Sequence, residues 1–542
     1  MSRTYLDEAA RVVDFLQAMN LELTEALVDN GEAEDEQVFA YDLAHLSAGA
    51  QAASVMVEYG HHGPMEEQLA LVFIADVARE ACAKLLGREA LLPRSTASSS
   101  SIRDFLSEFL QPKVLAALAQ APGPNHLEEH YELVQESFHR FATERIEPYA
   151  SEVHRKNLDV PEDIIAGLGE LGAFGLSIPE SYGGSAQHTP DDFMAMVIAT
   201  EELSRASLSI GGSLITRPEI LARALLRGGT EAQKQRWLPL LADGSVMNAV
   251  AVTEPDFGSD VAHLRTTASK SPHGDGWLIN GVKTWCTFAG RADVLMLLAR
   301  TDPDRSLAHR GLSLFMVPKE RYYGEAFTID QRGGGRLEAR AIDTIGYRGM
   351  HSYEIAFDNF FVDDDALIGG ESGLGRGFYF QMEGFENGRI QTAARAVGLM
   401  QRAYEEALSY ARHRNVFGQA VLDYQLTSAK LGRMAAIIQA SRQFSYHVAG
   451  LMGSGKGALE ASMIKAYVCR AAEWVTREAM QIHGGMGYAE EFTVSRLFVD
   501  ARVLSIFEGA DETLALKVIA RRLLDQATKG REIGEALPER GQ

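Results

Sequence analysis

The chain has 542 residues, 46% hydrophobic and 23% charged, which excludes a disordered chain or a membrane-embedded one and predicts a multidomain globular protein. A formal net charge of -22 argues against general attraction to nucleic acid or anionic lipid, since both select clustered lysine and arginine. Cys82, Cys286 and Cys469 lie far apart, which argues against a disulfide framework or a zinc site and fits a reducing cytosol.

Residues 1–125 are expected to form a helical extension. Apolar residues recur at helical spacing, first at Val12, Phe15, Leu16 and Met19 and again at Leu69, Val72, Phe73 and Val77. The start of the chain is acidic and lacks the apolar core of a signal peptide, so we expect an untargeted, cytoplasmic protein. Breaker-rich stretches at 93–101 and 121–125 bracket one more helix, which starts near Ile102.

Four segments follow the extension. Residues 126–245 have helical periodicity, and residues 246–370 alternate short β-branched and aromatic runs with turns, which predicts a β-domain. Long periodic helices return over 371–530, and residues 531–542 have the composition of a polar tail. The predicted fold class is therefore α+β.

The first segment with chemical content is 251–260, where a strand ends in a turn rich in hydroxyl and backbone N–H groups. Such a turn suits an anionic or hydrogen-bonding ligand. Taken alone, an ordinary surface turn explains it equally well.

Five more motifs follow this turn in a fixed order: Trp285-Cys286-Thr287, Arg348-Gly349, residues 410–418 with Gln425, residues 481–487 and residues 506–512. Each is weak alone, but together they resemble the acyl-CoA dehydrogenase family over roughly residues 127–524. The resemblance implies a helical domain, a central β-barrel-like domain and a C-terminal four-helix bundle. It also implies FAD as the cofactor and α,β-dehydrogenation of an acyl-CoA thioester as the reaction.

The resemblance assigns two groups of residues to FAD. In the β-domain, Thr253 and Ser259 would bond the flavin ring and its surroundings, Trp285 would cover one ring face and Thr287 would bond an edge, with Val252, Gly258 and Cys286 beside them. Taken alone, a tryptophan at a strand end is more often a core residue.

In the C-terminal domain, Arg414, Phe417 and Gln425 would reach the FAD of a neighbouring subunit, which implies a homo-oligomer, a dimer or a tetramer. The residues expected near the adenosine part of FAD are Gln481, His483, Gly484, Gly485 and Gly487. Four further FAD contacts are expected directly after the catalytic residue, at Gly509, Ala510, Asp511 and Glu512.

Glu508 is the catalytic base that the resemblance implies. The α-proton of a thioester is weakly acidic, so a base must be held close to it and fixed donors must meet the developing oxygen charge. Some relatives carry the base on another helix, at the position that Gly388 occupies here. Gly388 has no side chain that could act, so Glu508 is the family-consistent candidate.

Departures from the family pattern bear on the substrate. The usual Gly-Thr-Ser-Glu after the base reads Gly509-Ala510-Asp511-Glu512, Phe257 replaces a small residue, and Cys286 stands where isoleucine or leucine is usual. The extension, an insert at 332–340 and the segment 284–294 resemble the branch of the family that oxidises (2S)-methylsuccinyl-CoA to mesaconyl-CoA in the ethylmalonyl-CoA pathway. That branch passes electrons to electron-transfer flavoprotein.

A substrate carboxylate in a closed pocket needs a partner, because an unpaired buried charge is costly. Arg217 is the first candidate for this partner, although an arginine at a helix end exposed to solvent is an equally good interpretation. His351 and Arg389 are the reserves. Ser259, Asn387 and Arg389 are expected, with Glu508, to line the substrate site.

Other functions stay open at this point. Within enzymes, they are another short-branched or dicarboxylic acyl-CoA dehydrogenase, or an acyl-CoA oxidase that reacts with oxygen. A DNA-binding flavoprotein on this fold would want a basic C-terminal surface, which the acidic chain does not offer. An assembly role would use the extension as its interaction module. The extension could equally cover the CoA channel, enlarge a subunit contact or derive from a duplication of the C-terminal hairpins.

Overall fold

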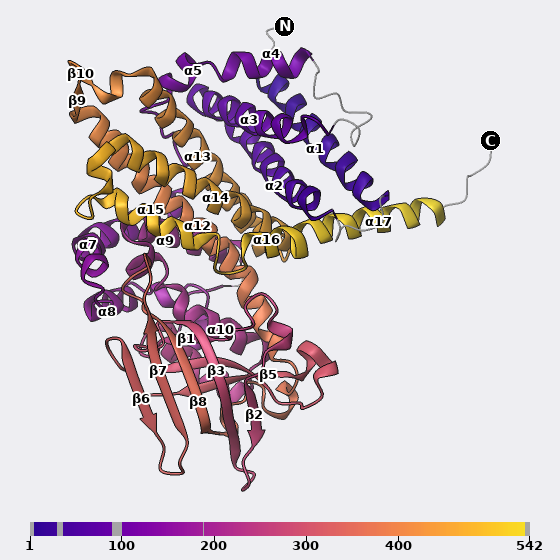
Figure 1. The fold of residues 1–542 in the computed structure, drawn as a ribbon, viewed down its shortest axis with the longest axis vertical. Coiled ribbons are helices and arrows are strands. Elements are labelled where there is room, and N and C mark those ends of the chain that lie inside the picture. Colours follow the sequence, from indigo (N-terminus) through magenta and orange to yellow (C-terminus); the bar gives the residue numbers. More distant parts are fainter. Residues whose placement is uncertain (1–4, 30–35, 89–99, 188, 537–542) are drawn as a thin grey trace. The chain divides into compact units, whose positions relative to one another are not determined.

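A computed structural model describes residues 5–29, 36–88, 100–187 and 189–536. The chain, drawn in Figure 1, divides into two compact units. Residues 1–128 and 392–542 make up the helical unit, and residues 129–391 make up the mixed unit. The division falls within one long helix, α12 (Gly377–His413).

The helical unit joins the two ends of the chain. From the N-terminal side come α1 (Tyr5–Asp29), α2 (Gln37–Gly60), α3 (Pro64–Leu85), α4 (Ser100–Phe109) and α5 (Pro112–Ala117). From the C-terminal side, after the second part of α12, come α13 (Gln425–Gly453), α14 (Ala458–His483), α15 (Thr493–Leu504), α16 (Asp511–Thr513) and α17 (Arg521–Ala536). The expected helical extension is confirmed, whereas residues 93–99 of its predicted breaker stretch lie outside the described residues.

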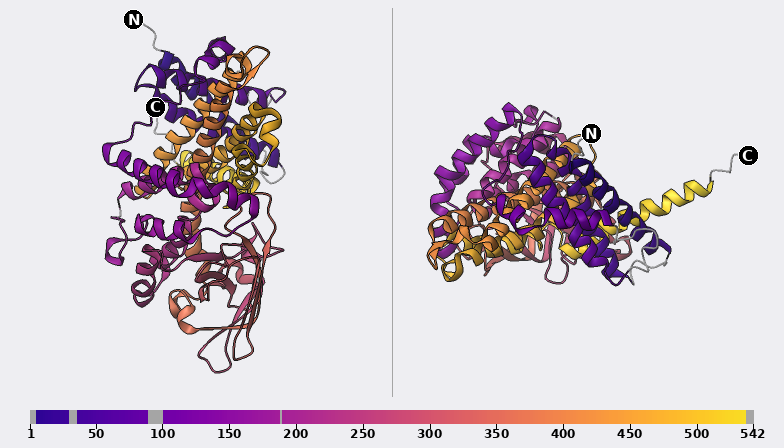
Figure 2. Two further views of the ribbon diagram at one scale, coloured as in Figure 1. Left: turned by 90° about the vertical axis from the view of Figure 1, so that its left-hand side faces the viewer. Right: turned by 90° about the horizontal axis from the view of Figure 1, so that it is seen from above.

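Small residues let the extension pack closely on the C-terminal helices. Ala44, Ala48 and Ala52 of α2 are fully buried, and α2 lies against α13 and α14 (Figures 1 and 2). Gly432 of α13 is needed for the approach of α5, because a Cβ there would lie 1.8 Å from the carbonyl oxygen of Leu115. The extension therefore packs within the same compact unit as the C-terminal helices.

Polar contacts fix the register of this packing. The hydroxyl of Tyr404 donates to the carbonyl oxygen of Ala119 at 2.9 Å. The carbonyl oxygen of Pro124 accepts from Tyr59 Oη and from Gln439 Nε2, each at 2.9 Å. Within the described ranges, no helix combines the length and the apolar character that crossing a membrane requires.

The mixed unit begins with helices and continues into a sheet. Its longer helices are α6 (Glu129–Phe141), α7 (Glu147–Lys156), α8 (Glu162–Glu170), α9 (Pro190–Ala206), α10 (Thr216–Gly228) and α11 (Glu231–Ala242). Its strands are β1 (Asn248–Ala251), β2 (Thr267–Lys270), β3 (Gly276–Thr287), β4 (Val294–Arg300), β5 (Leu312–Pro318), β6 (Ala326–Asp330), β7 (Arg336–Ile342) and β8 (Ser352–Asp363). Together they form an eight-stranded sheet in the order β1-β4-β2-β3-β8-β7-β6, with β5 paired to β4.

The core of the mixed unit lies where α10 and α11 cover the β1-β4-β5 part of the sheet. All seven residues of β4 are buried, which explains its unbroken apolar run, because a strand covered on both faces has no polar side. Leu221 and Leu225 of α10 belong to the same buried cluster as Met296 and Leu298 of β4. This packing fixes α10, and with it the position of Arg217, against the sheet.

The insert at 332–340 lies in the antiparallel hairpin of β6 and β7. It starts in the turn, where the N–H of Gln331 donates to the oxygen of Gly335, and continues into β7. The helix α17 continues to Ala536 and so includes the first residues of the predicted polar tail, 531–542. No proline interrupts the helix before Pro538, and polar residues do not by themselves end a helix.

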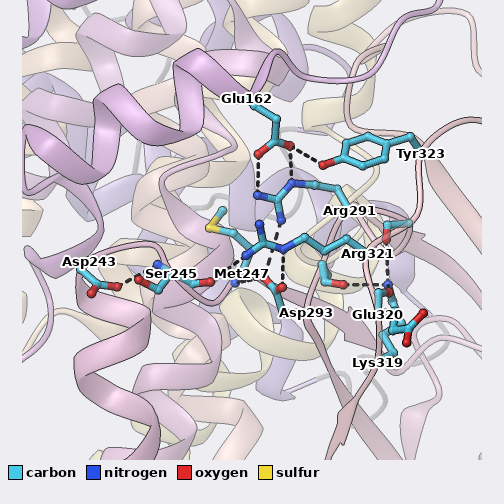
Figure 3. Close-up of polar contacts among 12 residues, drawn as sticks. Glu162, Asp243, Ser245, Met247, Arg291, Asp293, Lys319, Glu320, Arg321 and Tyr323 are labelled. Atoms are coloured by element: carbon cyan, nitrogen blue, oxygen red, sulfur yellow. Dashed lines mark hydrogen bonds and ion pairs between the residues drawn. The ribbon is translucent and has the colours of Figure 1, made fainter.

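A network of charged side chains connects α8 with the start of β4 (Figure 3). Arg291 is 6% exposed; its Nη2 donates to Glu162 at 2.8 Å and its Nη1 lies 3.6 Å from Asp293. Arg321 Nε donates to the other oxygen of Asp293 at 2.5 Å, and Tyr323 donates to Glu162 at 3.0 Å. Arg291 therefore joins a helix to the sheet across this contact.

We expect Arg291→Ala to lower the free energy of unfolding by about 1–3 kcal/mol, which urea denaturation would measure. The change leaves Asp293 with fewer partners, but Glu162 is partly exposed, so water recovers part of the loss. Arg336→Ala, which breaks an exposed pair with Glu338, is the control and should cost under about 0.5 kcal/mol. Equal effects of the two changes would contradict a structural role for the network.

Candidate active site

A buried ion pair holds the turn after β1. Lys283 is fully buried in β3, and its Nζ donates to the carbonyl oxygen of Val252 and to Glu254, each at 2.9 Å. Glu254 also accepts from the backbone N–H groups of residues 265–266 at 2.7 and 2.8 Å. Burial lowers the pKa of Lys283 to about 8, although Glu254 opposes this shift. The polar loop 255–264 is thereby fastened at both ends.

The same turn lies beside Trp285. The N–H of Thr284 donates to the carbonyl oxygen of Thr253 at 2.8 Å, which brings two of the predicted flavin contacts together. Trp285 is 56% exposed and has a left-handed backbone with φ +57°, so the interpretation of this tryptophan as a core residue is wrong. The next side chain, Cys286, is fully buried, and burial raises the pKa of its thiol to about 12.

The remaining residues of this unit that are predicted to contact the flavin differ in their exposure. Thr287 ends β3 and shares a hydrogen bond of 2.9 Å with Ser352 of β8. Gly258 and Ser259 are exposed in the loop, and a Cβ added to Gly258 would meet nothing within 4 Å. Val252 is buried, and its carbonyl oxygen already accepts from Lys283.

Arg217 is buried at the start of α10. It is 5% exposed; its Nε donates to the carbonyl oxygen of Ser213 and its Nη2 to the hydroxyl of Thr216, both at 3.2 Å. Both acceptors are neutral, and no carboxylate among the described side chains lies within ion-pair distance of this guanidinium. The alternative of a solvent-exposed arginine is wrong.

The other candidates for a substrate carboxylate have different surroundings. His351 lies 2.8 Å from Asp159, whose hydrogen bond raises the pKa of His351 above its ordinary value. This histidine already has a carboxylate partner. Asn387 and Arg389 are buried on α12, at 6% and 7% exposure.

In the helical unit, Glu508 occupies a tight loop between α15 and α16. Its backbone is left-handed, with φ +53°, and Gly509 follows with φ +96°. The N–H of Asp511 closes the loop by donating to the oxygen of Ser505 at 3.0 Å, and Lys465 Nζ donates to the oxygen of Gly509 at 2.5 Å. The N–H of Glu508 makes no backbone hydrogen bond within the described chain.

The side chain of Asp511 faces the extension. Tyr41 Oη donates to Asp511 Oδ2 at 2.5 Å, and His45 Nε2 lies 3.2 Å from the same oxygen. Burial alone would raise the pKa of Asp511, but His45, Tyr41 and nearby Arg470 together lower it. The side chain of Asp511 is thus already engaged within the chain, and its N–H donates to Ser505. Of its neighbours, Ala510 is partly buried and Glu512 is exposed.

The segment around Arg414 forms a small hairpin, in which β9 (Asn415–Val416) pairs with β10 (Gln419–Ala420). Its two-residue turn, Phe417 and Gly418, has positive φ angles of +49° and +88°. Such turns prefer asparagine or glycine, so a phenylalanine that is 97% exposed there has no local reason to be present. Arg414 and Gln425 are exposed beside it, as a contact with another molecule requires.

The glycine segment after α14 has two kinds of glycine. A Cβ added to Gly484 or Gly485 would meet nothing within 4 Å, so both leave open space for a ligand. Gly487 is different, because a Cβ there would lie 2.4 Å from the oxygen of Met480, so internal packing requires this glycine. His483 is buried and stacks on Tyr410 with ring centres 4.3 Å apart, while Gln481 is exposed.

The sequence analysis missed four residues that shape these segments: Lys283, Glu254, Tyr41 and His45. A lysine at a buried position of β3 was a possible indication of the first pair. Tyr41 and His45 lie four residues apart on one face of α2, but nothing in that spacing identifies a partner 470 residues away.

Comparison with known families accounts for most of the chain. Residues 128–245 match the N-terminal domain of acyl-CoA dehydrogenases, residues 249–360 the middle domain and residues 375–524 the C-terminal domain. The chain belongs to the acyl-CoA dehydrogenase family. It is therefore an FAD-dependent oxidoreductase acting on a CH–CH bond. The open glycines and the exposed Trp285 fit FAD, which needs close backbone approach and an aromatic surface.

Individual relatives agree with this assignment. The chain is 44% identical to (2S)-methylsuccinyl-CoA dehydrogenase of Cereibacter sphaeroides, over 74% of this chain and 71% of the relative. It is 35% identical to an acyl-CoA dehydrogenase of Bacillus subtilis, over 74% of this chain and 99% of the relative.

Two solved structures are also similar. Glutaryl-CoA dehydrogenase in complex with glutaryl-CoA has a TM-score of 0.67 at 29% identity, covering 74% of this chain and 96% of that one. Butyryl-CoA dehydrogenase of Megasphaera elsdenii has a TM-score of 0.66 at 29% identity, covering 74% and 99%. The expected fold class is confirmed.

We expect Arg414→Ala to weaken FAD binding by roughly tenfold or more, because a charge-assisted bond to a phosphate is among the stronger hydrogen bonds. The flavin-to-protein absorbance ratio after gel filtration would measure the loss, and the elution volume would show weaker subunit association. Arg412→Ala is the control, since Arg412 bonds to Gln120 within the chain. Full FAD content in an Arg414→Ala monomer would contradict the assignment.

Proposed function

We propose that this enzyme oxidises a short branched acyl-CoA with a terminal carboxylate, with (2S)-methylsuccinyl-CoA as substrate and mesaconyl-CoA as product. Electron-transfer flavoprotein is the proposed acceptor of the electrons. The observation that carries this proposal is Arg217, a buried guanidinium whose described partners are neutral oxygens. The similarity to a methylsuccinyl-CoA dehydrogenase supports it independently.

A buried cation without an anionic partner is unfavourable, because the interior does not replace the hydration that the charge has lost. Such an arginine is retained where an anion from outside the chain completes the site. The carboxylate of a dicarboxylic acyl chain has the charge and the planar shape that a guanidinium binds with two parallel bonds. Arg217 would then favour these substrates over uncharged chains of equal length.

Glu508 is the proposed general base. FAD, when bound, supplies the acceptor for the hydride that leaves the β-carbon. The Glu508 carboxylate takes the α-proton, and its own backbone N–H, which has no backbone acceptor in the described chain, is available to the thioester oxygen. Thr253, Ser259, Trp285 and Thr287 would orient the cofactor, and Asn387 and Arg389 would line the substrate site. Arg414, Phe417 and Gln425 would complete the site of a second subunit.

We expect Glu508→Gln to bind FAD and acyl-CoA but to lose turnover by at least the ~10²–10⁴-fold that a positioned acid or base contributes. Glutamine keeps the side-chain size and the backbone N–H but cannot accept the proton. Anaerobic stopped-flow reduction of the flavin by (2S)-methylsuccinyl-CoA would measure the chemical step. Glu491→Gln, which changes an exposed glutamate outside the segments assigned to FAD, is the control and should reduce its flavin normally. Wild-type reduction by the Glu508→Gln enzyme would overturn the assignment of the base.

We expect Arg217→Met to lower kcat/KM for (2S)-methylsuccinyl-CoA by roughly 10²-fold or more, because an unpaired substrate carboxylate would then be buried. Turnover of straight-chain butyryl-CoA should change little, so the preference for the carboxylate disappears. Steady-state assays with an artificial electron acceptor, with and without oxygen, would measure this and would also reveal any oxidase activity.

The control for Arg217→Met is Arg223→Met on the same helix, since Arg223 has its own partner in Glu219 at 3.4 Å. This change should affect both substrates alike. An equal loss on the two substrates in Arg217→Met would assign the carboxylate contact to another residue.

A further inference from the structure

We propose that Tyr41 and His45 of the N-terminal extension are positioning residues for catalysis, because they hold, through Asp511, the loop that carries Glu508. This inference rests on the proposed function in two respects: Glu508 is the base, and (2S)-methylsuccinyl-CoA is the substrate used to test it. It assigns to the extension a role in the chemical step. The extension lies outside the three matched domains, since these begin at residue 128.

The contact is short and shielded from water. Tyr41 and His45 lie one helical turn apart on α2 and approach the same oxygen, Asp511 Oδ2, at 2.5 and 3.2 Å. The side chains of His45 and Asp511 are 4% and 12% exposed. Figure 1 shows α2 and α16 within the same helical unit. A hydrogen bond to a charged, buried acceptor is stronger than an exposed one, so this contact holds Asp511 firmly.

The distance along the chain from Asp511 to Glu508 is only three residues, and the intervening backbone is constrained. The Asp511 N–H closes the loop onto Ser505, and Lys465 holds the oxygen of Gly509. Glu508 itself has a left-handed backbone, which a glutamate adopts only when its surroundings impose it. A shift of Asp511 would therefore reach the carboxylate of Glu508.

Two departures from the family pattern meet at this contact. One is the extension, and the other is Asp511, which stands where the family usually has a serine. A buried aspartate without a donor would be costly, and the extension supplies one in the hydroxyl of Tyr41, with His45 in contact beside it. Nearby Arg470 adds favourable positive charge. The two departures thus depend on each other physically: Asp511 needs α2, and α2 gains through Asp511 a direct connection to the proposed base.

The test compares two tyrosines on the same helix. Tyr41→Phe removes the hydroxyl that holds Asp511. The control, Tyr59→Phe, removes a hydroxyl on the same helix that donates to Pro124, away from the Glu508 loop. Both proteins would be assayed as full-length holoenzymes, per bound FAD, for anaerobic flavin reduction by saturating (2S)-methylsuccinyl-CoA. We expect Tyr41→Phe to slow reduction by roughly ten- to a hundredfold, as a small displacement of a catalytic group does.

The isotope effect of the α-proton on flavin reduction distinguishes a slower proton removal from a loss of protein stability. With α-deuterated substrate, Tyr41→Phe should show a larger isotope effect on flavin reduction than the wild type, because proton removal becomes slower, while KM stays near the wild-type value. His45→Gln should shift the rate and the isotope effect in the same direction. Tyr59→Phe should match the wild type in both.

A double-mutant cycle tests the route through Asp511. If Tyr41 acts through this carboxylate, Tyr41→Phe should slow reduction much less in an Asp511→Asn background than in the wild type. Unaltered reduction in both Tyr41→Phe and His45→Gln, effects equal to those of Tyr59→Phe, or a fully additive cycle would overturn the inference. Its failure is separable from that of the proposed function, because Glu508→Gln tests the base regardless of the extension.

Discussion

The backbone of Glu508 is left-handed, and the geometry of the proposed base depends on this constraint. A glutamate gains nothing by itself from φ +53°, so the neighbouring contacts must hold it there. Those contacts come from α14 through Lys465, from the end of α15 through Ser505 and from α2 through Asp511. The loop is therefore specified by three segments that are distant in sequence, and the extension supplies one of them.

Among the predicted functional residues, Trp285 and Phe417 also have a left-handed backbone. Both are large aromatic side chains with high exposure, 56% and 97%, where burial would be the favourable outcome for such residues. Strained backbone together with exposed aromatic surface is hard to explain by stability alone. It is readily explained if each side chain is held ready for a ligand or for another subunit.

Buried charges divide the polar interior into structural and functional parts. Lys283 with Glu254 and Arg291 with Glu162 are paired within the chain, and each fixes one segment to another. Arg217 has neutral described partners, which is why we connect it with a charged substrate. Asp511 belongs to both groups, since its pairing is internal but the loop it fastens carries the proposed base. Whether a buried charge has a charged partner within the chain, more than its burial, separates the structural charges from the functional ones.

Helical and strand periodicity predicted the order of the segments, and the motif order predicted the family, because both are local patterns that can be read along the chain. Those patterns agree with the observed helical extension, with the long helix 377–413 and with the strands that end at Ala251 and Thr287. The sequence also placed Arg217, Glu508 and Trp285 among the functional candidates, but their burial and backbone conformation were undetermined. Only the tertiary structure decided that Arg217 is buried, that α17 continues to Ala536 and that Tyr41 and His45 meet Asp511. Such contacts depend on how helices far apart in the chain pack together, and local spacing contains no information about that partner.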